Sequence, residues 1–396
     1  MKWSSAVSEQ NTLDAAIDEC LERVESELDG QNPDLIVTFV SSHHESAFDD
    51  VIPKLRERLG PGMVVGCSAG GVIGSGKEVE HRPGFALSAA VLPGVDLVPF
   101  HVADESGLPD GDAPPTEWES RVGTSALNDP LFVLLADPFS VRGDRLLTGL
   151  DYAFPDSPKV GGLASGGQVP FGNALFLGDE VHRSGLVGLA MHGDIGVDTI
   201  VAQGCRPIGR PMRVTGCNGS ILTELDSRTP IDLLKETFSE LDERDRSLAQ
   251  HSLFVGVVMD SFNDNPQHGD FLVRNLVVDS RTGALAVSEN LEEGQLLQFH
   301  LRDADTSSQD LDAMLTRYAG AGPVHDEAGA LLFSCLGRGS YLYGRADHDT
   351  DMFRERVGAM PLGGFFCNGE IGQVGGSTYL HSYTSSFGIF HPKRLV

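Results

Sequence analysis

The sequence predicts an α/β protein with two domains, in which strand-helix-strand units are internally duplicated and build mixed sheets. Apolar runs typical of buried strands alternate with segments of amphipathic helical spacing. Glycine-rich turns follow apolar runs at three places, residues 66–71, 161–167 and 363–376. The length of 396 residues and the hydrophobic content of 40% allow more than one core, so two or more domains are expected.

Charge and composition argue against several classes of function. The formal net charge is -28, from 57 acidic and 29 basic residues, and such a chain lacks the basic face that binding to nucleic acid or anionic lipid requires. The N-terminus is polar and acidic, unlike a secretory signal, and no apolar run approaches the roughly 20 residues of a membrane helix. The sequence therefore predicts a cytoplasmic protein without nucleic-acid or membrane partners.

The six cysteines are scattered along the chain and form no Cys-x-x-Cys pair. This pattern fits neither a disulfide framework nor a structural zinc site, so free thiols are expected. His43 and His44 follow each other at the end of a predicted strand, where neighbouring side chains point to opposite faces. Polar capping is therefore preferred to metal binding, and neither a metal nor a cofactor is predicted.

Residues 1–32 predict a helical lead-in, because apolar side chains recur at helical spacing over 12–28, with Asn11 or Thr12 as N-cap. Residues 33–225 predict the first domain. A strand at 35–40 leads to Ser41 and His43, a helix follows at about 48–59, and a strand at 63–65 ends in the first glycine turn. This order indicates a βαβ unit.

The same order returns further along the chain. A strand at 131–136 and the turn at 161–167 repeat the first unit at about the same interval, so we interpret residues 33–205 as an internal duplication. A helix at 230–241 opens the second predicted domain, 226–390. That domain contains a third strand at 331–336, a helix at 350–357 with Asp349 as N-cap, and the turn at 363–376.

Two catalytic motifs are matched only in part. Residues 71–77 resemble a phosphate-binding loop, but Glu78 stands where a hydroxyl group should hold magnesium, and no helix follows. Residues 66–70 fit Gly-x-Ser-x-Gly with Ser68 as nucleophile, yet further glycines replace the required helix. A hydrolase or transferase using Cys67, Ser68 or Cys367 stays an alternative, and a reactive cysteine would need a lowered pKa.

Glu370 is the carboxylate of the last glycine turn, close in sequence to Cys367 and Asn368. It is either solvated at the surface or held inside a pocket, and a pocket requires a donor or a cation to offset desolvation of the charge. Arg338 and Arg345 are the candidate cationic partners.

These segments resemble the FIST family. Residues 35–43 and 65–71 are similar to the opening of the FIST N-terminal domain, and residues 335–339 and 363–376 to the FIST C-terminal domain; the run GFFCNGEIG at 364–372 is the most specific element. The resemblance implies an intracellular sensory module that binds small ligands, amino acids among them. Since no output segment is expected outside the two domains, the output is expected either from a separate signalling protein or from the sensor acting as a stand-alone binding protein.

The sequence thus predicts a sensor that binds a small polar ligand, such as an amino acid, without chemical change. Backbone amides at 66–71 and 161–167 would receive a carboxylate, and Glu370 with Asn368 an amino group. A protein-binding adaptor without a small ligand is a further alternative, and no catalytic residue is predicted. The predicted ligand-binding residues are Ser41, His43, Cys67, Ser68, Gly70, Ser165, Gly166, Arg338, Cys367, Asn368 and Glu370.

Overall fold

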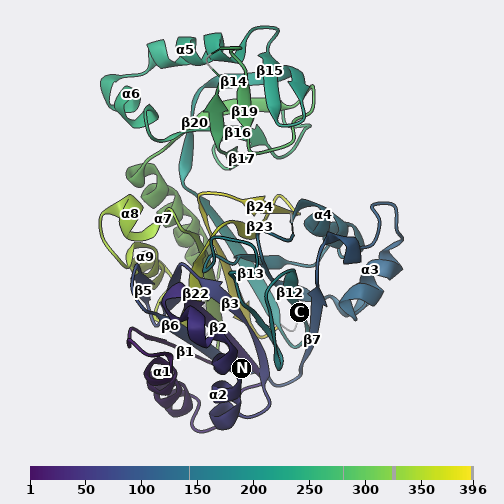
Figure 1. Cartoon of the computed structure of the whole chain (residues 1–396), viewed down its shortest axis with the longest axis vertical. Coiled ribbons are helices and arrows are strands. Elements are labelled where there is room, and N and C mark those ends of the chain that lie inside the picture. The colour runs from purple at the N-terminus through teal and green to yellow at the C-terminus, as the bar shows by residue number, and fades with distance from the viewer. Residues whose placement is uncertain (142, 280, 323–326, 394–396) are drawn as a thin grey trace. The chain divides into compact units, whose positions relative to one another are not determined.

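The computed structural model of the chain describes residues 1–141, 143–279, 281–322 and 327–393 (Figure 1). The chain divides into two compact units. Unit 1 comprises Met1–Val201, Asp312–Leu380 and Thr384–Val396, and unit 2 comprises Ala202–Leu311 and His381–Tyr383. The predicted domains 33–225 and 226–390 are each continuous in sequence. Unit 1 is not continuous, because the chain returns to it after unit 2. The domain boundaries stay a prediction.

Unit 1 is built on three six-stranded sheets. In spatial order, the first sheet contains β1 (Lys2–Ser8), β6 (Phe85–Val91), β2 (Leu35–Ser41), β3 (Met63–Ala69), β10 (Leu175–Leu177) and β11 (Glu180–His182). The second contains β7 (Val95–Val102), β12 (Leu186–Gly193), β8 (Leu131–Ala136), β9 (Lys159–Leu163), β23 (Glu370–Val374) and β24 (Ser377–His381). The third contains β13 (Gly196–Gln203), β25 (Thr384–His391), β21 (Gly329–Cys335), β22 (Leu362–Cys367), β4 (Gly71–Gly74) and β5 (Lys77–Glu80).

The three sheets share one arrangement. Each is centred on a parallel pair, β2–β3, β8–β9 or β21–β22, with antiparallel strands on both sides. Each parallel pair marks one repeat of the chain, and the first, second and third sheets belong to the first, second and third repeats. Each repeat also contributes a hairpin to the sheet of another repeat: β4–β5 joins the third sheet, β10–β11 the first and β23–β24 the second. The predicted α/β class, with internally duplicated strand-helix-strand units in mixed sheets, is confirmed, and the structure adds a third copy.

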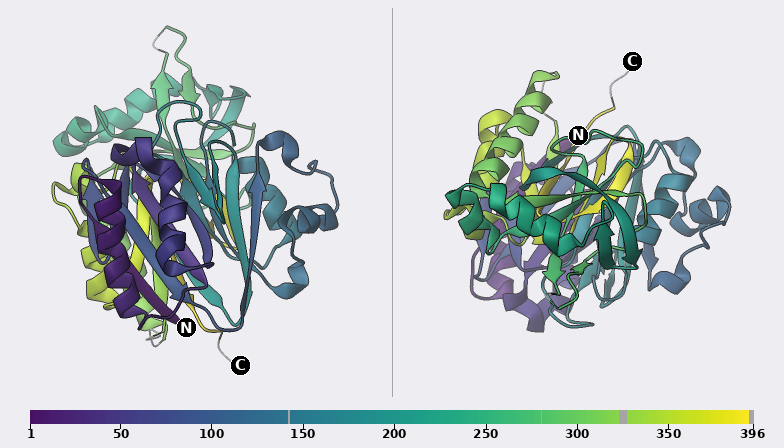
Figure 2. Two further views of the ribbon diagram at one scale, coloured as in Figure 1. Left: turned by 60° about the horizontal axis from the view of Figure 1, so that its bottom comes forward. Right: turned by 90° about the horizontal axis from the view of Figure 1, so that it is seen from above.

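Helices pack against the first two sheets of unit 1, where α1 and α2 share one apolar cluster with the first sheet, and α3 and α4 share another with the second (Figure 2). The hydroxyl of Thr12 accepts a hydrogen bond from Ala15 N, which confirms the predicted N-cap of α1. The helices outside unit 2 are α1 (Leu13–Glu27), α2 (Val51–Leu59), α3 (Pro115–Val122), α4 (Asp144–Ala153), α7 (Ala304–Gly320, which begins in unit 2), α8 (Gly339–Tyr343) and α9 (His348–Arg356), with 3-10 turns at Ser42–Asp50, Glu105–Gly107 and Ala126–Asn128.

Unit 2 is built on one antiparallel sheet with its own apolar core. Its strands, in spatial order, are β17 (Phe271–Arg274), β16 (Leu253–Val258), β20 (Leu296–Arg302), β14 (Cys205–Asn218), β15 (Ile221–Leu225), β19 (Leu285–Val287) and β18 (Leu276–Val278). Its helices are α5 (Pro230–Glu240) and α6 (Glu243–Ala249). Across the described residues of both units, no helix combines the length and the apolar character needed to cross a membrane.

The inner faces of the three sheets of unit 1 meet in one central core. Phe39 of the first sheet stacks on Phe365 of the third with ring centroids 4.7 Å apart, and Leu135 of the second sheet belongs to the same cluster. Such close packing across sheets requires complementary side chains on all three inner faces. A polar residue on an inner face is therefore conspicuous.

One glycine in each repeat lies against the neighbouring parallel strand. A Cβ atom added at Gly66, Gly161 or Gly364 would lie 1.9, 1.8 or 2.0 Å from a carbonyl oxygen of that strand, a distance that no side chain tolerates. The three glycines occupy the same register in their sheets. They therefore define equivalent positions in the three repeats and allow residue-by-residue comparison.

Candidate functional site

The three glycine turns meet at the carboxyl ends of β3, β9 and β22. Ser165 N donates a hydrogen bond to Ser68 O over 3.2 Å, and Asn368 N donates to Leu163 O over 3.1 Å. Each donor lies four residues after the glycine that defines its repeat, and each acceptor lies two residues after it. The second turn is thus joined to the first, and the third to the second, by equivalent backbone contacts.

A side chain closes the third junction. The hydroxyl of Ser165 accepts a hydrogen bond from Gly70 N over 2.8 Å and donates to the carbonyl oxygen of Phe366. The three turns therefore form a closed ring, which we call the turn ring (residues 66–71, 161–167 and 363–370). Among the described hydrogen bonds, Ser165 is the side chain that joins Gly70 of the first turn to Phe366 of the third turn.

Backbone amides of the turn ring have acceptors inside the protein. Ser68 N donates to Ala174 O over 2.8 Å, Gly166 N donates to Ser68 O over 3.3 Å, and Gly167 N donates to the side-chain oxygen of Asn173 over 2.7 Å. A ligand carboxylate at these amides would have to displace such bonds. The binding role predicted for Ser68, Gly70, Ser165 and Gly166 stays a prediction.

The thiols of the ring are held in the protonated form. Cys67 and Cys367 are fully buried, and burial raises the pKa of both thiols well above the ordinary value; for Cys367 the nearby carboxylate of Glu370 adds to the rise. Ser68 donates to the side-chain oxygen of Asn173 over 3.1 Å and accepts from Ala174 N over 3.0 Å, and neither partner is a base. These environments oppose the activation that a nucleophilic thiol or hydroxyl needs.

Two predicted residues lie at the end of β2. Ser41 is buried, and its hydroxyl accepts a hydrogen bond from Gly84 N over 2.9 Å. His43 is exposed in the 3-10 turn that follows. Ser41 thus satisfies a backbone amide next to the start of a neighbouring strand. The polar capping predicted for His43 and His44, and a role of Ser41 or His43 in ligand binding, stay predictions.

Glu370 occupies a core position that is apolar in the other two repeats. Sheet register places it opposite Gly162, the residue after the defining glycine of β9. The residues in the equivalent position are Val72 and Leu175, both fully buried in the central core. Glu370 is itself completely buried. The fold therefore does not require a carboxylate here, because two of its three repeats fill the position with a hydrocarbon.

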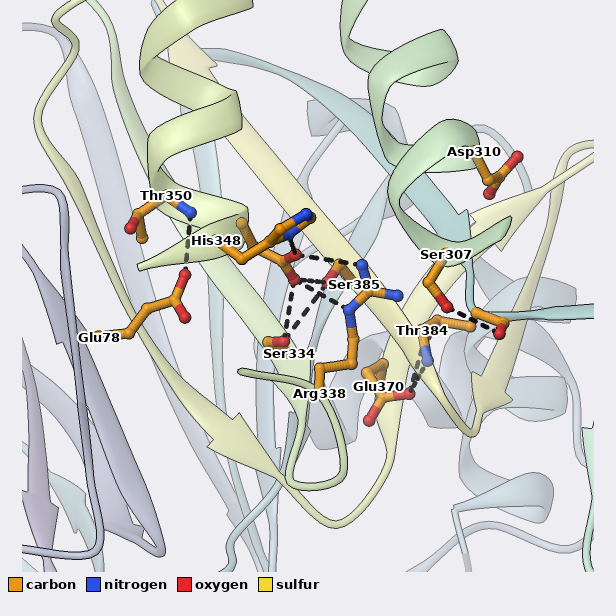
Figure 3. A network of polar contacts seen from close by, with 12 residues as sticks. Glu78, Ser307, Asp310, Ser334, Arg338, His348, Thr350, Glu370, Thr384 and Ser385 are labelled. Carbon is orange, nitrogen blue, oxygen red and sulfur yellow. Dashed lines mark hydrogen bonds and ion pairs between the residues drawn. The ribbon is translucent and has the colours of Figure 1, made fainter. Parts of the chain in front are cut away.

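The carboxylate of Glu370 has neutral partners. Its Oε2 atom accepts hydrogen bonds from Thr384 N over 3.0 Å and from the Thr384 hydroxyl over 2.8 Å (Figure 3). Its Oε1 atom lies 3.5 Å from the thiol of Cys367. Burial raises the pKa of Glu370 to about 7, although the Thr384 bonds act in the opposite direction. The group is therefore poised between its neutral and charged forms near neutral pH.

Neither predicted arginine is hydrogen-bonded to Glu370, which corrects that expectation. Arg338 donates from its Nε and Nη2 atoms to Asp349, over 2.9 and 3.2 Å (Figure 3). Arg345 donates to Asp351 over 2.8 Å. Both members of the Arg338–Asp349 pair are buried. Asp349 attracts the guanidinium because a buried carboxylate without a cation would be far more costly than the existing pair. Arg338 acts on Glu370 only through its charge, which lowers the pKa of that carboxyl.

Asp349 is the centre of a buried polar network. Besides Arg338, it accepts hydrogen bonds from the hydroxyls of Ser385 over 2.6 Å and Ser334 over 3.4 Å, and His348 Nδ1 lies 2.9 Å from it. Burial alone would raise the pKa of Asp349, but the charge of Arg338 and these donors hold it well below its usual range. The Nη1 atom of Arg338 has no hydrogen-bond partner among the described residues.

Glu78 adds a second buried carboxylate with a raised pKa. Its Oε1 atom accepts a hydrogen bond from Thr350 N over 2.9 Å, whereas its Oε2 atom is buried without a partner in the described part of the chain. Burial, reinforced by the charge of Asp349, raises the pKa of Glu78 to about 8. Three buried acidic side chains of this region thus differ widely in their tendency to ionise.

The sequence missed most of this network. Asp349 was expected as the N-cap of its helix, but α9 has Asp347 at that position and Asp349 points from the first turn into the interior. The sequence pattern offers Glu78 only as an argument against a phosphate-binding loop. Glu78, Val79 and Glu80 alternate like a strand with one polar face, so the pattern gives no sign that Glu78 is buried. Glu80 also has a partner in the structure, since it accepts a hydrogen bond from Ser340 N. Among the described residues, no cluster of three His, Cys, Asp or Glu side chains is arranged to hold a metal ion.

The family of the chain follows from sequence comparison. The profile of the FIST N domain matches residues 34–228, and that of the FIST C domain matches residues 230–373. The chain therefore belongs to the FIST family, as the resemblance in its glycine turns predicts. FIST domains are associated with sensory roles in signal transduction.

Similar proteins extend over nearly the whole chain. An uncharacterized protein of Mycobacterium tuberculosis strain H37Rv, Rv0628c, is 34% identical over 400 residues, which cover 98% of this chain and 100% of that protein. An uncharacterized protein of Mycobacterium bovis, Mb0898c, is 35% identical over 367 residues, or 92% of each chain. Among solved structures, a cyanuric acid hydrolase from A. caulinodans aligns with a TM-score of 0.34 and 7% identity, covering 99% of this chain and 100% of that one, a level from which no function follows.

Proposed function

We propose that this FIST protein is a sensor that binds a small polar molecule through an ammonium group at Glu370 and leaves it chemically unchanged. The observation that carries the proposal is the buried carboxylate in a core position where the other repeats have Val72 and Leu175. A carboxylate weakens the packing of an apolar core, so its presence there favours a role outside folding.

The partners of Glu370 suggest which atom would meet the ligand. Both Thr384 bonds go to Oε2, whereas Oε1 has only a thiol at 3.5 Å, and a thiol is a weak donor. An ammonium group at Oε1 would replace a weak contact by a charge-assisted hydrogen bond. Asn368 lies two residues away and is exposed, so entry is proposed at this part of the turn ring.

An amino acid is the proposed ligand class, because it combines an ammonium group with a second polar end that Asn368 could bind. The other ring residues, with their internal hydrogen bonds, are proposed to position Glu370. Direct contacts of Ser68, Gly70, Ser165 and Gly166 with the ligand stay a prediction. Transmission of the signal to a separate protein belongs to the same proposal, and it agrees with the sensory role of the family.

Titration calorimetry against a panel of amino acids tests the proposal. The wild type is compared with Glu370→Gln, which keeps the shape but removes the charge, and with Glu355→Gln, which removes a charge from an exposed position on α9. We expect Glu370→Gln to weaken binding by about tenfold or more, the value of a charge-assisted hydrogen bond, and Glu355→Gln to leave it unchanged. Absence of binding at millimolar concentrations of every amino acid, or equal affinity in Glu370→Gln, would refute the proposal.

The pH dependence of binding provides a second test. An ammonium ligand needs the ionised carboxylate, and the pKa of Glu370 is raised to about 7 by burial. Below that pH the carboxyl binds a proton in place of the ligand. Affinity should therefore fall by about tenfold for each pH unit below 7 and level off above it. Affinity that is constant from pH 5 to pH 8 would contradict recognition by Glu370.

A further inference from the structure

Unit 1 contains a cavity of about 340 Å³, away from the turn ring. It lies where α1, the turn between β4 and β5, and α9 come together, and residues 358–362 complete its wall. Its volume is within the range of about 300–1,000 Å³ that small-molecule sites occupy. Its lining comes from four separate chain segments, since Ser5 of β1 also contributes.

The charge of the cavity differs from that of the chain. The sequence has 57 acidic and 29 basic residues, yet the charged groups that line the cavity are two arginines, Arg23 and Arg354, and one carboxylate, Glu27. Contacts within the protein satisfy that carboxylate, because its Oε1 atom accepts from Arg23 Nε over 2.8 Å and its Oε2 atom accepts from the Ser4 hydroxyl over 2.7 Å. The cavity therefore has an excess of positive charge.

Arg354 supplies that excess. Its Nη2 atom donates to Asp351, which does not line the cavity and is shared with Arg345. Two guanidinium groups thus face one carboxylate. The Nη1 atom of Arg354 lies 3.4 Å from the place where a Cβ atom of Gly76 would stand, and Gly76 is itself part of the lining. A guanidinium group has five N–H donors, so Arg354 retains donors that can point to a ligand.

The rest of the lining mixes hydroxyl-bearing and apolar side chains. Phe353 is buried and stacks on Phe387 with ring centroids 5.5 Å apart, and Met360 and Leu362 also line the cavity. Ser75 also lines the cavity, and its hydroxyl donates to the backbone of β1. The lining therefore combines guanidinium groups with apolar side chains, a combination that suits an anion with a short hydrocarbon chain.

We propose that this cavity binds a small organic monocarboxylate, with the carboxylate at Arg354 and Arg23 and the hydrocarbon chain against Phe353 and Met360. The proposal does not depend on ligand binding at Glu370. At about 0.15 M salt the Debye length is about 8 Å, so most carboxylates of this acidic protein are screened from the ligand, whereas the two arginines are in contact with it.

Titration calorimetry with butanoate, and with butan-1-ol as its uncharged counterpart, tests the proposal at that ionic strength. The variant is Arg354→Gln and its matched control is Arg345→Gln, since both arginines bind Asp351 and have similar exposure, 55% and 53%, but only Arg354 lines the cavity. We expect butanoate to bind the wild type, Arg354→Gln to weaken this binding by about tenfold, and Arg345→Gln to change it by less than about twofold.

Three results would overturn the proposal. Butanoate could fail to bind the folded wild type, butan-1-ol could bind equally well, or the two arginine variants could lose affinity to the same extent, which would indicate a general effect of net charge. The Glu370→Gln variant separates the two proposed sites, because it should leave butanoate binding unchanged. Its loss of amino-acid binding, in turn, says nothing about the cavity.

Discussion

The third repeat of unit 1 differs from the first two at two places. Where the first and second repeats fill a core position with Val72 and Leu175, the third has Glu370. The first two repeats pass from β1 to α1 and from β7 to α3 without an inserted domain, whereas the third has unit 2 between β13 and α7. The first two repeats thus show what the fold requires, and the third shows what has been added to it. We therefore expect the functional residues in the third repeat, because its special features are not required by the fold.

The largest expected effect tests whether the buried polar network of the third repeat depends on its ion pair. Replacing Asp349 by alanine leaves Arg338 buried and uncompensated, which should lower the free energy of unfolding by about 3–5 kcal/mol. Urea unfolding measures this loss. Asp351→Ala is the control, since Asp351 binds arginines at the surface and should cost less than about 1 kcal/mol.

A double variant sharpens the same test. Arg338→Met combined with Asp349→Leu replaces the buried ion pair by two apolar side chains. This double variant should recover a large part of the stability lost in Asp349→Ala. Loss of less than about 1 kcal/mol in Asp349→Ala would instead show that water reaches and solvates Arg338.

The next effect is the pH dependence of stability that Glu370 contributes. Burial raises the pKa of Glu370 from the ordinary 4.5 to about 7, so the folded state binds this proton more tightly than the unfolded state. The contribution of Glu370 to stability is therefore most favourable below pH 4.5 and is lost as the pH rises to 7. The full loss corresponds to about 3 kcal/mol. Glu370→Gln removes this term.

The measurement compares urea midpoints at pH 5 and pH 8. The advantage of Glu370→Gln over the wild type should grow between these values by about 2.5 kcal/mol, because about a quarter of the full loss has already occurred at pH 5. Glu78 also has a raised pKa, about 8, but it is present in both proteins and its contribution cancels. Parallel stability curves for the two proteins would mean that Glu370 is as well solvated in the folded as in the unfolded state.

Local pattern was enough to predict what repeats along the chain. The glycine turns, the strands before them and the N-cap of α1 are features of neighbouring residues, and the family follows from the same turns. Strand β1 was not predicted, because Ser4 and Ser5 interrupt its apolar pattern. Both serines are buried, and Ser5 donates to the carbonyl oxygen of Leu362 in another repeat. A contact so distant in sequence leaves no local signal.

The exchange of hairpins was beyond sequence reasoning for the same reason. A hairpin that pairs within its own repeat has the same alternation as one that pairs with another, so β23 gives no sign that it lies beside β9. Glu370 was identified because a carboxylate among glycines is unusual. Its significance, however, depends on the comparison with Val72 and Leu175, which only the register of the three sheets provides.

The smallest expected effect concerns the junction at which the turn ring departs from its own symmetry. Two junctions are direct backbone bonds, whereas the third passes through the hydroxyl of Ser165, from Gly70 N to Phe366 O. Ser165→Ala leaves both backbone groups without this partner and should lower the free energy of unfolding by about 1–2 kcal/mol. Asn368→Ala, at the equivalent position, removes only a 3.3 Å hydrogen bond from an exposed side chain to Ala164 O and should change it by about 0.5 kcal/mol or less. If the free energy of unfolding of Ser165→Ala equals that of the wild type, Gly70 N must donate directly to Phe366 O in the variant. All three junctions of the turn ring would then be backbone hydrogen bonds.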